Sequence, residues 1–149
     1  MPYDYDKIHR DRYEREEALL ADPERHADYF FEFMSEINIA RTASKLIAGH
    51  LTKGSNVLDV GCGTGMCSAM LHESGYRMIV TDPSPGAVEI ASRRIGNHPT
   101  VAYHVSDLEG LTKFIDPVNG IVCLEVIEHV PDPQAFLSLL SHSLKPEGY

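Results

Sequence analysis

Features that would indicate several other classes of protein are missing from this sequence. No apolar run approaches the length needed to cross a bilayer, so we expect no transmembrane segment. The three cysteines include no C-x-x-C pair, which argues against zinc and redox chemistry and favours buried, reduced thiols. Residues 1–6 resemble neither a signal peptide nor a transit peptide. We therefore expect a cytoplasmic protein.

Basic residues are also scarce. The chain has 13 Lys and Arg against 22 Asp and Glu, and its formal net charge is −9 at pH 7. A nucleic-acid partner would need a basic face, so this charge argues against one. The arginines near the N-terminus alternate with acids and indicate a mixed, solvated helix: Arg10, Arg12, Arg15 and Arg25.

From about residue 55 onwards, short apolar runs alternate with amphipathic segments. Besides the strand before residue 61, strands are expected over 77–81, 100–105 and 118–124, the last apolar enough to be buried on both faces. Helices are expected between them. This alternation predicts a doubly wound α/β fold with a parallel sheet and right-handed crossovers.

Two of the expected helices have clear start signals. Ser84 is a good N-cap with Pro85 in the first helical position, and Asp132 with Pro133 repeats the pattern near the C-terminus. The last helix is expected to face the core with these side chains: Phe136, Leu137, Leu140 and Leu144.

The part before the first strand is helical in pattern. Residues 1 to about 22 are highly charged, and a second helical region runs from Asp22-Pro23 towards Gly49, with a break expected near Ser35. We expect residues 1–35 to form a helical cap and residues 36–149 to form the α/β domain, one domain with a real core.

The most informative stretch is LDVGCGTG at residues 58–65, whose glycine loop (residues 61–65) follows the first strand. Glycines at alternate positions let a strand turn sharply into a helix and leave backbone N–H groups bare for a ligand. Asp59 precedes the loop, where it can hold an ammonium group or a water. A dinucleotide site would place pyrophosphate near that carboxylate and a small residue where Met66 stands. A glycine-rich turn without a ligand is the other alternative.

Acids also follow the second and third strands. Asp82 lies 21 residues after Gly61, the interval at which an acid reaches the two ribose hydroxyls. Its alternative role is at the start of the next helix, although Ser84 already caps that helix. Asp107 could be a simple turn residue. In open α/β sheets, however, ligands bind at the carboxyl ends of the strands, so we expect these acids to surround one site.

The run at 58–65 closely resembles the cofactor loop of class I S-adenosylmethionine-dependent methyltransferases, and the acids downstream fit the same pattern. The resemblance implies S-adenosylmethionine as cofactor and the strand order 3-2-1-4 for a Rossmann-like sheet. It also implies a set of cofactor-binding residues. These are Asp59, Gly61, Cys62, Gly63 and Gly65 near the methionine end, Asp82 with Pro83 at the ribose, Asp107 with Leu108 at the adenine, and Glu125.

A second motif, E-x-x-E-H at residues 125–129, resembles the ubiquinone-biosynthesis O-methyltransferases, which methylate catechol hydroxyls. The resemblance implies that Glu125, Glu128 and His129 hold a divalent cation such as Mg²⁺. One helical turn would bring the three side chains to one face, and two carboxylates with an imidazole suit such a metal. His129, beside Glu128, could instead act in catalysis as the general base, which needs no metal. Both could also be solvated residues before the next helix.

In the resembled enzymes an N-terminal helical segment often lies over the cofactor, so residues 1–35 are expected to form a lid that includes Tyr3, Tyr5 or Tyr13. The acceptor is expected to be a small molecule, methylated on an oxygen or alternatively on a nitrogen. A catechol is one candidate, although this chain lacks the tryptophans of the ubiquinone group's N-terminal signature.

The last residues, 144–149, resemble the turn that leads into the fifth strand of the family fold. Strands five to seven are then expected to be missing, which would leave the fourth strand as an unpaired apolar edge where a homodimer could form. The rival functions are a non-catalytic S-adenosylmethionine-binding fragment and a nicotinamide-dependent oxidoreductase. Asp59 and Met66 argue against the second.

Overall fold

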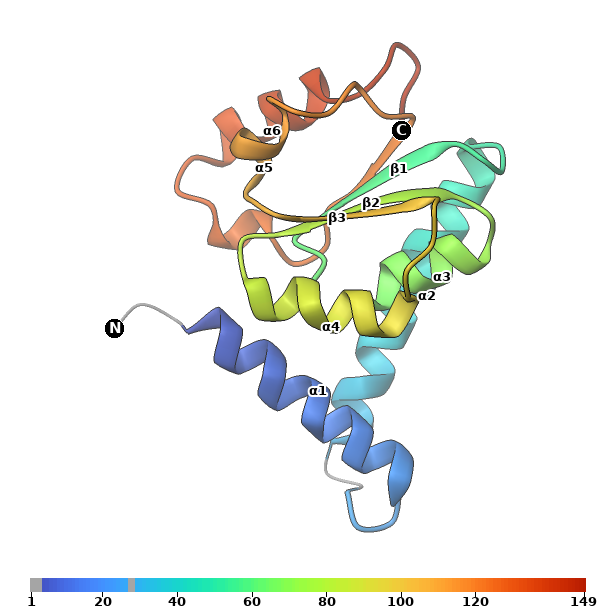
Figure 1. Ribbon diagram of the computed structural model, residues 1–149, viewed down its shortest axis with the longest axis vertical. Coiled ribbons are helices and arrows are strands. Elements are labelled where there is room, and N and C mark those ends of the chain that lie inside the picture. The colour runs from blue at the N-terminus through green and yellow to red at the C-terminus, as the bar shows by residue number, and fades with distance from the viewer. Residues whose placement is uncertain (1–3, 27–28) are drawn as a thin grey trace.

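The computed structural model describes residues 4–26 and 29–149 and consists of a small parallel sheet between helices (Figure 1). Two long helices come first, α1 (Tyr5–Ala21) and α2 (Phe30–His50). The remaining elements follow in the order β1 (Asn56–Val60), α3 (Met66–Glu73), β2 (Arg77–Asp82), α4 (Pro85–Ile95), β3 (Val101–Val105), α5 (Leu108–Leu111), β4 (Gly120–Val122), the short 3-10 helix η1 (Ile127–His129) and α6 (Pro133–His142).

All three strand pairings are parallel, and the sheet order is β3-β2-β1-β4. The expected doubly wound α/β fold and its 3-2-1-4 order are therefore confirmed. β1 lies in the centre, with β2 on one side and β4 on the other. Parallel strands end at the same edge, so the residues after β1, β2, β3 and β4 meet there.

Both faces of the central strand β1 are buried, as expected for a parallel strand inside a sheet, whereas the edge strand β3 is partly exposed. Side chains alternate along β1, so that Val57 packs with α2 and α3 on one face and Leu58 packs with α5 and α6 on the other. α4 packs on the first face as well, beside α3. α1 packs against the outside of α4 (Figure 1). The N-terminal end of α1 lies near the start of α4, at the edge where the strands end, and the helix runs along α4 from there.

The expected helix starts are confirmed. Ser84 Oγ accepts a hydrogen bond from Ala87 N at 3.1 Å, and Asp132 Oδ1 accepts one from Ala135 N at 3.0 Å. The prediction of which α6 side chains face the core is wrong at one residue, because Leu137 points to solvent. Leu139 replaces it against the core, together with Phe136, Leu140 and Leu144.

The N-terminal helices differ from the expectation in two ways. α2 begins at Phe30 rather than at Asp22-Pro23, and it continues past Ser35 without a break. It stays continuous through Ser35 because Phe33 and Ala40, which flank that residue seven positions apart on one face of the helix, are both buried. The boundary expected after residue 35 therefore falls inside α2.

The expectation of an unpaired edge at the fourth strand is wrong where the chain's last residues lie along it. Ile121 N donates to the Tyr149 carbonyl at 2.9 Å, and Tyr149 N donates to the Asn119 carbonyl at 3.0 Å. Val118 also forms a parallel bridge with Leu144. These contacts occupy the outer backbone groups of β4 only as far as Ile121 N, and a homodimer through the rest of this edge stays a prediction.

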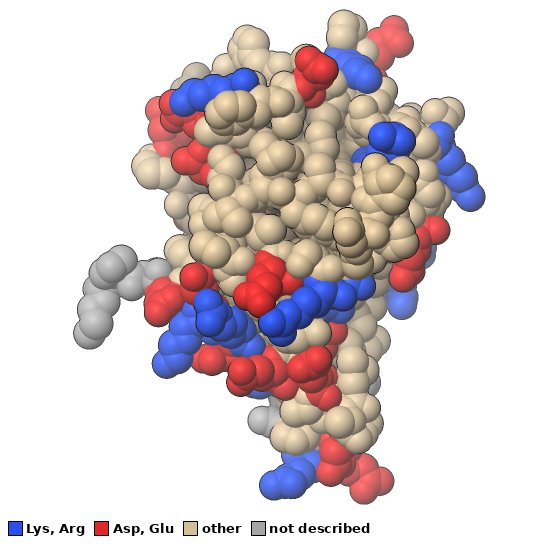
Figure 2. Space-filling view, viewed as in Figure 1, with Lys and Arg blue, Asp and Glu red and all other residues tan. Residues whose placement is uncertain are grey.

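The charged residues of α1 lie over a surface that carries both signs. Figure 2 shows Lys and Arg mixed with Asp and Glu over α1 and α4. Arg12 and Arg15, for example, both form ion pairs with Glu32 of α2 at 3.7 Å. This mixture fits the solvated helix expected from the sequence. Within the described residues, no helix has the length and apolarity to traverse a bilayer.

Candidate functional site

The glycine loop after β1 folds back onto the end of β2. The N–H groups of Gly61 and Cys62 both donate to the Thr81 carbonyl, at 2.9 and 3.0 Å. The N–H of Gly63 donates to Asp82 Oδ2 at 3.1 Å. The expectation that these N–H groups are bare for a ligand is therefore wrong. The loop uses them to attach itself to the neighbouring strand.

Two of the glycines are required by close packing. Gly61 has φ of +71°, and a Cβ there would collide with Val126 after β4. Gly65 has φ of +76°, and its Cβ would lie 2.6 Å from Ala91 Cβ and 2.8 Å from Ala91 Cα. The alternation of glycines thus serves the turn and the contact between α3 and α4.

Asp59 is 2% exposed, and its Oδ2 accepts a hydrogen bond of 2.6 Å from Ser68 Oγ of α3. Burial raises the pKa of Asp59 to about 6, the hydrogen bond from Ser68 opposes that shift, and the charge of Asp82 adds to it. A cation near this carboxylate would stabilise its ionised form. Direct contact between Asp59 and a ligand remains a prediction.

Asp82 joins the glycine loop to the start of α4. It is 5% exposed, and its Oδ1 accepts a hydrogen bond from Ser84 N at 2.9 Å while Oδ2 accepts that from Gly63. Each carboxylate oxygen has two lone pairs, so each can accept one more hydrogen bond. Pro83, the next residue, is exposed beside it.

The residues expected at the adenine take different positions. Asp107 is exposed and caps α5, with Oδ1 accepting a hydrogen bond from Gly110 N at 2.7 Å. The Leu108 side chain is buried in the core. Cys62, expected near the methionine end, is buried as well, and burial raises the pKa of its thiol. Leu108 and Cys62 therefore fill the interior with their side chains.

The E-x-x-E-H motif does not form one helical turn. Glu125 has φ of +55°, a left-handed conformation, and only Ile127–His129 is helical. Glu125, Glu128 and His129 therefore do not share a face as expected. Within residues 4–26 and 29–149, no group of three His, Cys, Asp or Glu side chains could hold a metal ion. The geometry does not fit the expected Mg²⁺ site.

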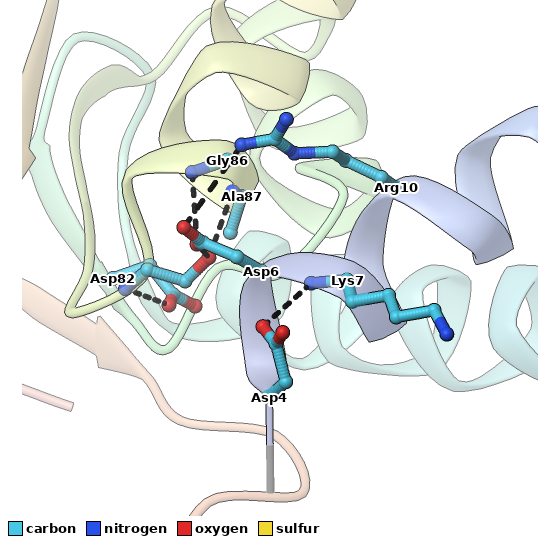
Figure 3. A network of polar contacts seen from close by, with 8 residues as sticks. Asp4, Asp6, Lys7, Arg10, Asp82, Gly86 and Ala87 are labelled. Atoms are coloured by element: carbon cyan, nitrogen blue, oxygen red, sulfur yellow. Dashed lines mark hydrogen bonds and ion pairs between the residues drawn. The ribbon is translucent and has the colours of Figure 1, made fainter.

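α1 adds residues that the sequence did not identify. Asp6 accepts a hydrogen bond from Ser84 Oγ and another from Gly86 N at 3.1 Å, next to Asp82 (Figure 3). The hydrogen bond from Ser84 is the main reason that the pKa of Asp6 is lowered. One turn further on, the His9 ring lies against Gly63. No local signal in the sequence pairs residues this far apart.

Two of the three tyrosines expected in the lid are among the described residues, and they lie in different places. The Tyr5 ring meets the His129 ring edge-on, with centroids 5.9 Å apart. Tyr13 faces Arg94, whose guanidinium carbon lies 5.9 Å from the ring centroid. Tyr3 falls outside the described residues. The N-terminal end of α1 therefore lies between the start of α4 and η1.

Comparisons with solved structures show the same fold. The magnesium protoporphyrin IX methyltransferase of Synechocystis PCC 6803, solved with bound S-adenosylhomocysteine, aligns with 75% of this chain and 53% of its own at 22% identity and a TM-score of 0.64. A structure of the Haloferax volcanii Trm112 methyltransferase activator with a putative methyltransferase aligns with 99% of this chain and 58% of its own, at 23% identity and a TM-score of 0.66.

Curated relatives share more sequence over a shorter range. The ubiquinone biosynthesis O-methyltransferase of Coxiella burnetii (strain RSA 493) is 36% identical over 97 residues, which cover 64% of this chain and 42% of the relative. That of Xylella fastidiosa (strain 9a5c) is 36% identical over 97 residues, or 39% of its length. This chain thus matches less than half of either relative. Residues 20–149 match the methyltransferase domain family, and the chain belongs to that family.

Proposed function

We propose that this chain is the S-adenosylmethionine-binding part of an enzyme that transfers a methyl group to an oxygen of a small molecule. The observation that carries the proposal is Asp82, a buried acid that links the glycine loop to α4 and retains acceptor capacity. Transfer to oxygen is supported by the name shared by the curated relatives at 36% identity.

The acids at the strand ends fit this cofactor chemically. S-adenosylmethionine carries a cationic amine, a ribose diol and an activated methyl group on a sulfonium, which it supplies to the acceptor. Asp82 would accept hydrogen bonds from the ribose hydroxyls, and the exposed Asp107 would accept one from the adenine amino group. Asp59 would favour the cationic amine electrostatically.

His129 is our candidate for the general base. Its side chain is exposed at the end of η1, next to Tyr5, so an acceptor hydroxyl can approach it from solvent. It would take the acceptor's proton as the methyl group is transferred, with Glu128 beside it in the motif. The protein's main further contribution would be to place the acceptor in line with the methyl group.

α1 would enclose this site as a lid. Its contacts through Asp6 and Tyr5 support that role, because they bring the N-terminal helix to the ends of β2 and β4.

The three cysteines are all free thiols, which supports the expected cytoplasmic location.

Calorimetric titration with S-adenosylhomocysteine tests the cofactor assignment. We expect micromolar binding that falls at least tenfold in Asp82→Ala and severalfold in Asp107→Ala, with thermal unfolding recorded to confirm that both variants fold. Glu89→Ala, an exposed acid on α4, is the control and should bind as the wild type does. Absence of binding by the folded wild-type chain would refute the proposal.

The acceptor is tested next by following formation of S-adenosylhomocysteine. Catechols, simple phenols and primary amines are compared as acceptors under the same conditions. Turnover of a hydroxyl compound supports transfer to oxygen, and turnover of amines alone contradicts it.

A further inference from the structure

α1 lies beside the glycine loop and is bound to α4 near both of its own ends. Near its start, Asp6 accepts hydrogen bonds from Ser84 and Gly86 at the beginning of α4 (Figure 3). Near its end, Glu16 forms an ion pair with Arg94 at the other end of α4. These attachments fix the helix between them, and the residue that this places over the loop is His9.

The His9 ring lies directly on the middle glycine of the loop. A Cβ added to Gly63 would lie 3.4 Å from His9 Cε1 and 3.7 Å from His9 Nδ1. The same glycine donates its N–H to Asp82 at 3.1 Å. The imidazole therefore lies next to the carboxylate that we assign to the ribose.

His9 Nδ1 is buried and has no hydrogen-bond partner among the described residues. A buried polar atom without a partner is costly, so such atoms in native proteins call for an explanation. Burial is the main cause that lowers the pKa of His9, and Arg12 acts in the same direction, whereas Asp82 and Asp6 oppose the shift. A neutral imidazole has one donor and one acceptor nitrogen and can thus bond a hydroxyl in either direction.

We propose that His9 is a cofactor-binding residue supplied by α1, and that its Nδ1 forms a hydrogen bond with a ribose hydroxyl of the bound nucleoside. The inference rests on the proposed function, since it requires a nucleoside at Asp82. It also gives α1 a defined role: the helix contributes a direct polar contact to the ligand in addition to covering it. Most of α1 precedes residues 20–149, the range matched by the family.

Two substitutions separate a hydrogen bond from simple packing. His9→Asn keeps a polar atom near the position of Nδ1, whereas His9→Leu keeps the bulk and removes the polar atom. If His9 bonds the ligand, His9→Leu should weaken binding of S-adenosylhomocysteine about tenfold, and His9→Asn should stay within about threefold of wild type. If His9 only packs, the order is reversed, and the proposal fails.

A second probe locates the contact on the ligand. 5′-Methylthioadenosine has the same nucleoside but no amino-acid group, so His9→Leu should weaken binding of both probes by a similar factor. A loss confined to S-adenosylhomocysteine would assign the contact to the amino-acid end and overturn the ribose assignment. His98→Leu is the matched control, because His98 lies beyond the far end of α4 beside His72 and should leave both affinities unchanged.

The outcomes distinguish this inference from the proposed function. If the folded wild-type chain binds neither probe, the proposed function is wrong and the role of His9 fails with it. If the wild type binds and loses affinity in Asp82→Ala but not in His9→Leu, the cofactor assignment stands and only the role of His9 is refuted.

Discussion

Glu16 of α1 and Arg94 of α4 form a bidentate ion pair, with N–O distances of 2.6 and 2.9 Å. Their side chains are 5% and 16% exposed. Arg94 Nε also donates to the Thr64 carbonyl in the glycine loop at 2.8 Å. One planar guanidinium therefore connects the N-terminal helix, α4 and the loop, a geometry that a lysine could not reproduce.

This ion pair should matter for stability. We expect Glu16→Gln to lower the free energy of unfolding by about 2 kcal/mol, because it leaves a largely buried guanidinium without its counter-charge. Glu89→Gln is the matched control: Glu89 and Arg93 also lie 2.6 Å apart, but both are more than half exposed, and the expected loss is below about 0.5 kcal/mol. Urea unfolding measures both, and equal losses would contradict the difference.

Gly65 should tolerate no side chain. In Gly65→Ala the new Cβ meets Ala91 at 2.6 Å while the backbone keeps φ of +76°, so we expect a loss of about 2–4 kcal/mol in unfolding free energy. Gly49→Ala is the control, since Gly49 lies in α2 with nothing within 4 Å of its Cβ position. That variant should be unchanged or more stable by up to about 1 kcal/mol. A thermal melt of Gly65→Ala that matches wild type would refute the packing argument.

The parts of this fold that depend on local signals could be predicted from the sequence. Ser84 and Pro85 start α4 as expected because a cap acts within one turn of its own helix. Asp82 reaches the glycine loop because parallel neighbouring strands end at the same edge. Strand order and the position of the acids therefore follow from spacing and from the family resemblance.

The expectations that failed at the candidate site involve contacts between parts of the chain far apart in sequence and, at Glu125, an unusual backbone conformation. The N–H groups of Gly61 and Cys62 look bare in sequence because their acceptor, Thr81, lies on another strand. The left-handed backbone at Glu125 breaks the expected helical turn. This conformation could not be predicted, because the position holds neither glycine nor asparagine, the residues that most often adopt it. In the sequence, Asp6 and His9 look like ordinary residues of a charged helix, because no neighbouring residue indicates that Asp6 contacts α4 and that His9 contacts the loop.

His129 should affect turnover without affecting cofactor affinity. With a catechol such as 3,4-dihydroxybenzoate as the acceptor, we expect His129→Gln to lower turnover about 100-fold or more, because it removes the proposed general base. Its affinity for S-adenosylhomocysteine should stay within about twofold of wild type. His142→Gln, which changes an exposed histidine on α6, is the control and should retain full turnover. If His129→Gln turns over as fast as the control, another group must take the proton.

Asp59 should make stability depend on pH in an unusual direction for a carboxylate. Its folded-state pKa of about 6 lies above the ordinary value of 3.8 because burial disfavours the charged form. Between these two values the folded state binds a proton that the unfolded state does not, so folding becomes more favourable as the pH falls through 6. The contribution is lost again as the pH rises above 6. From pH 7.5 to 5.0 the gain is about 1.4 kcal/mol.

The comparison with Asp59→Asn isolates this effect, because other titrating groups are common to both proteins and cancel. Unfolding free energies measured in urea at pH 7.5 and pH 5.0 should show that the wild type gains about 1.4 kcal/mol relative to the variant. Cofactor binding gives a second readout. If Asp59 favours the cationic amine as proposed, its protonation removes that charge, so wild-type affinity for S-adenosylhomocysteine should fall between pH 7.5 and 5.0 more steeply than that of Asp59→Asn. If the wild type instead loses stability relative to the variant on acidification, Asp59 is ionised in the folded state at pH 5.0. That result would contradict the raised pKa of Asp59 on which this prediction depends.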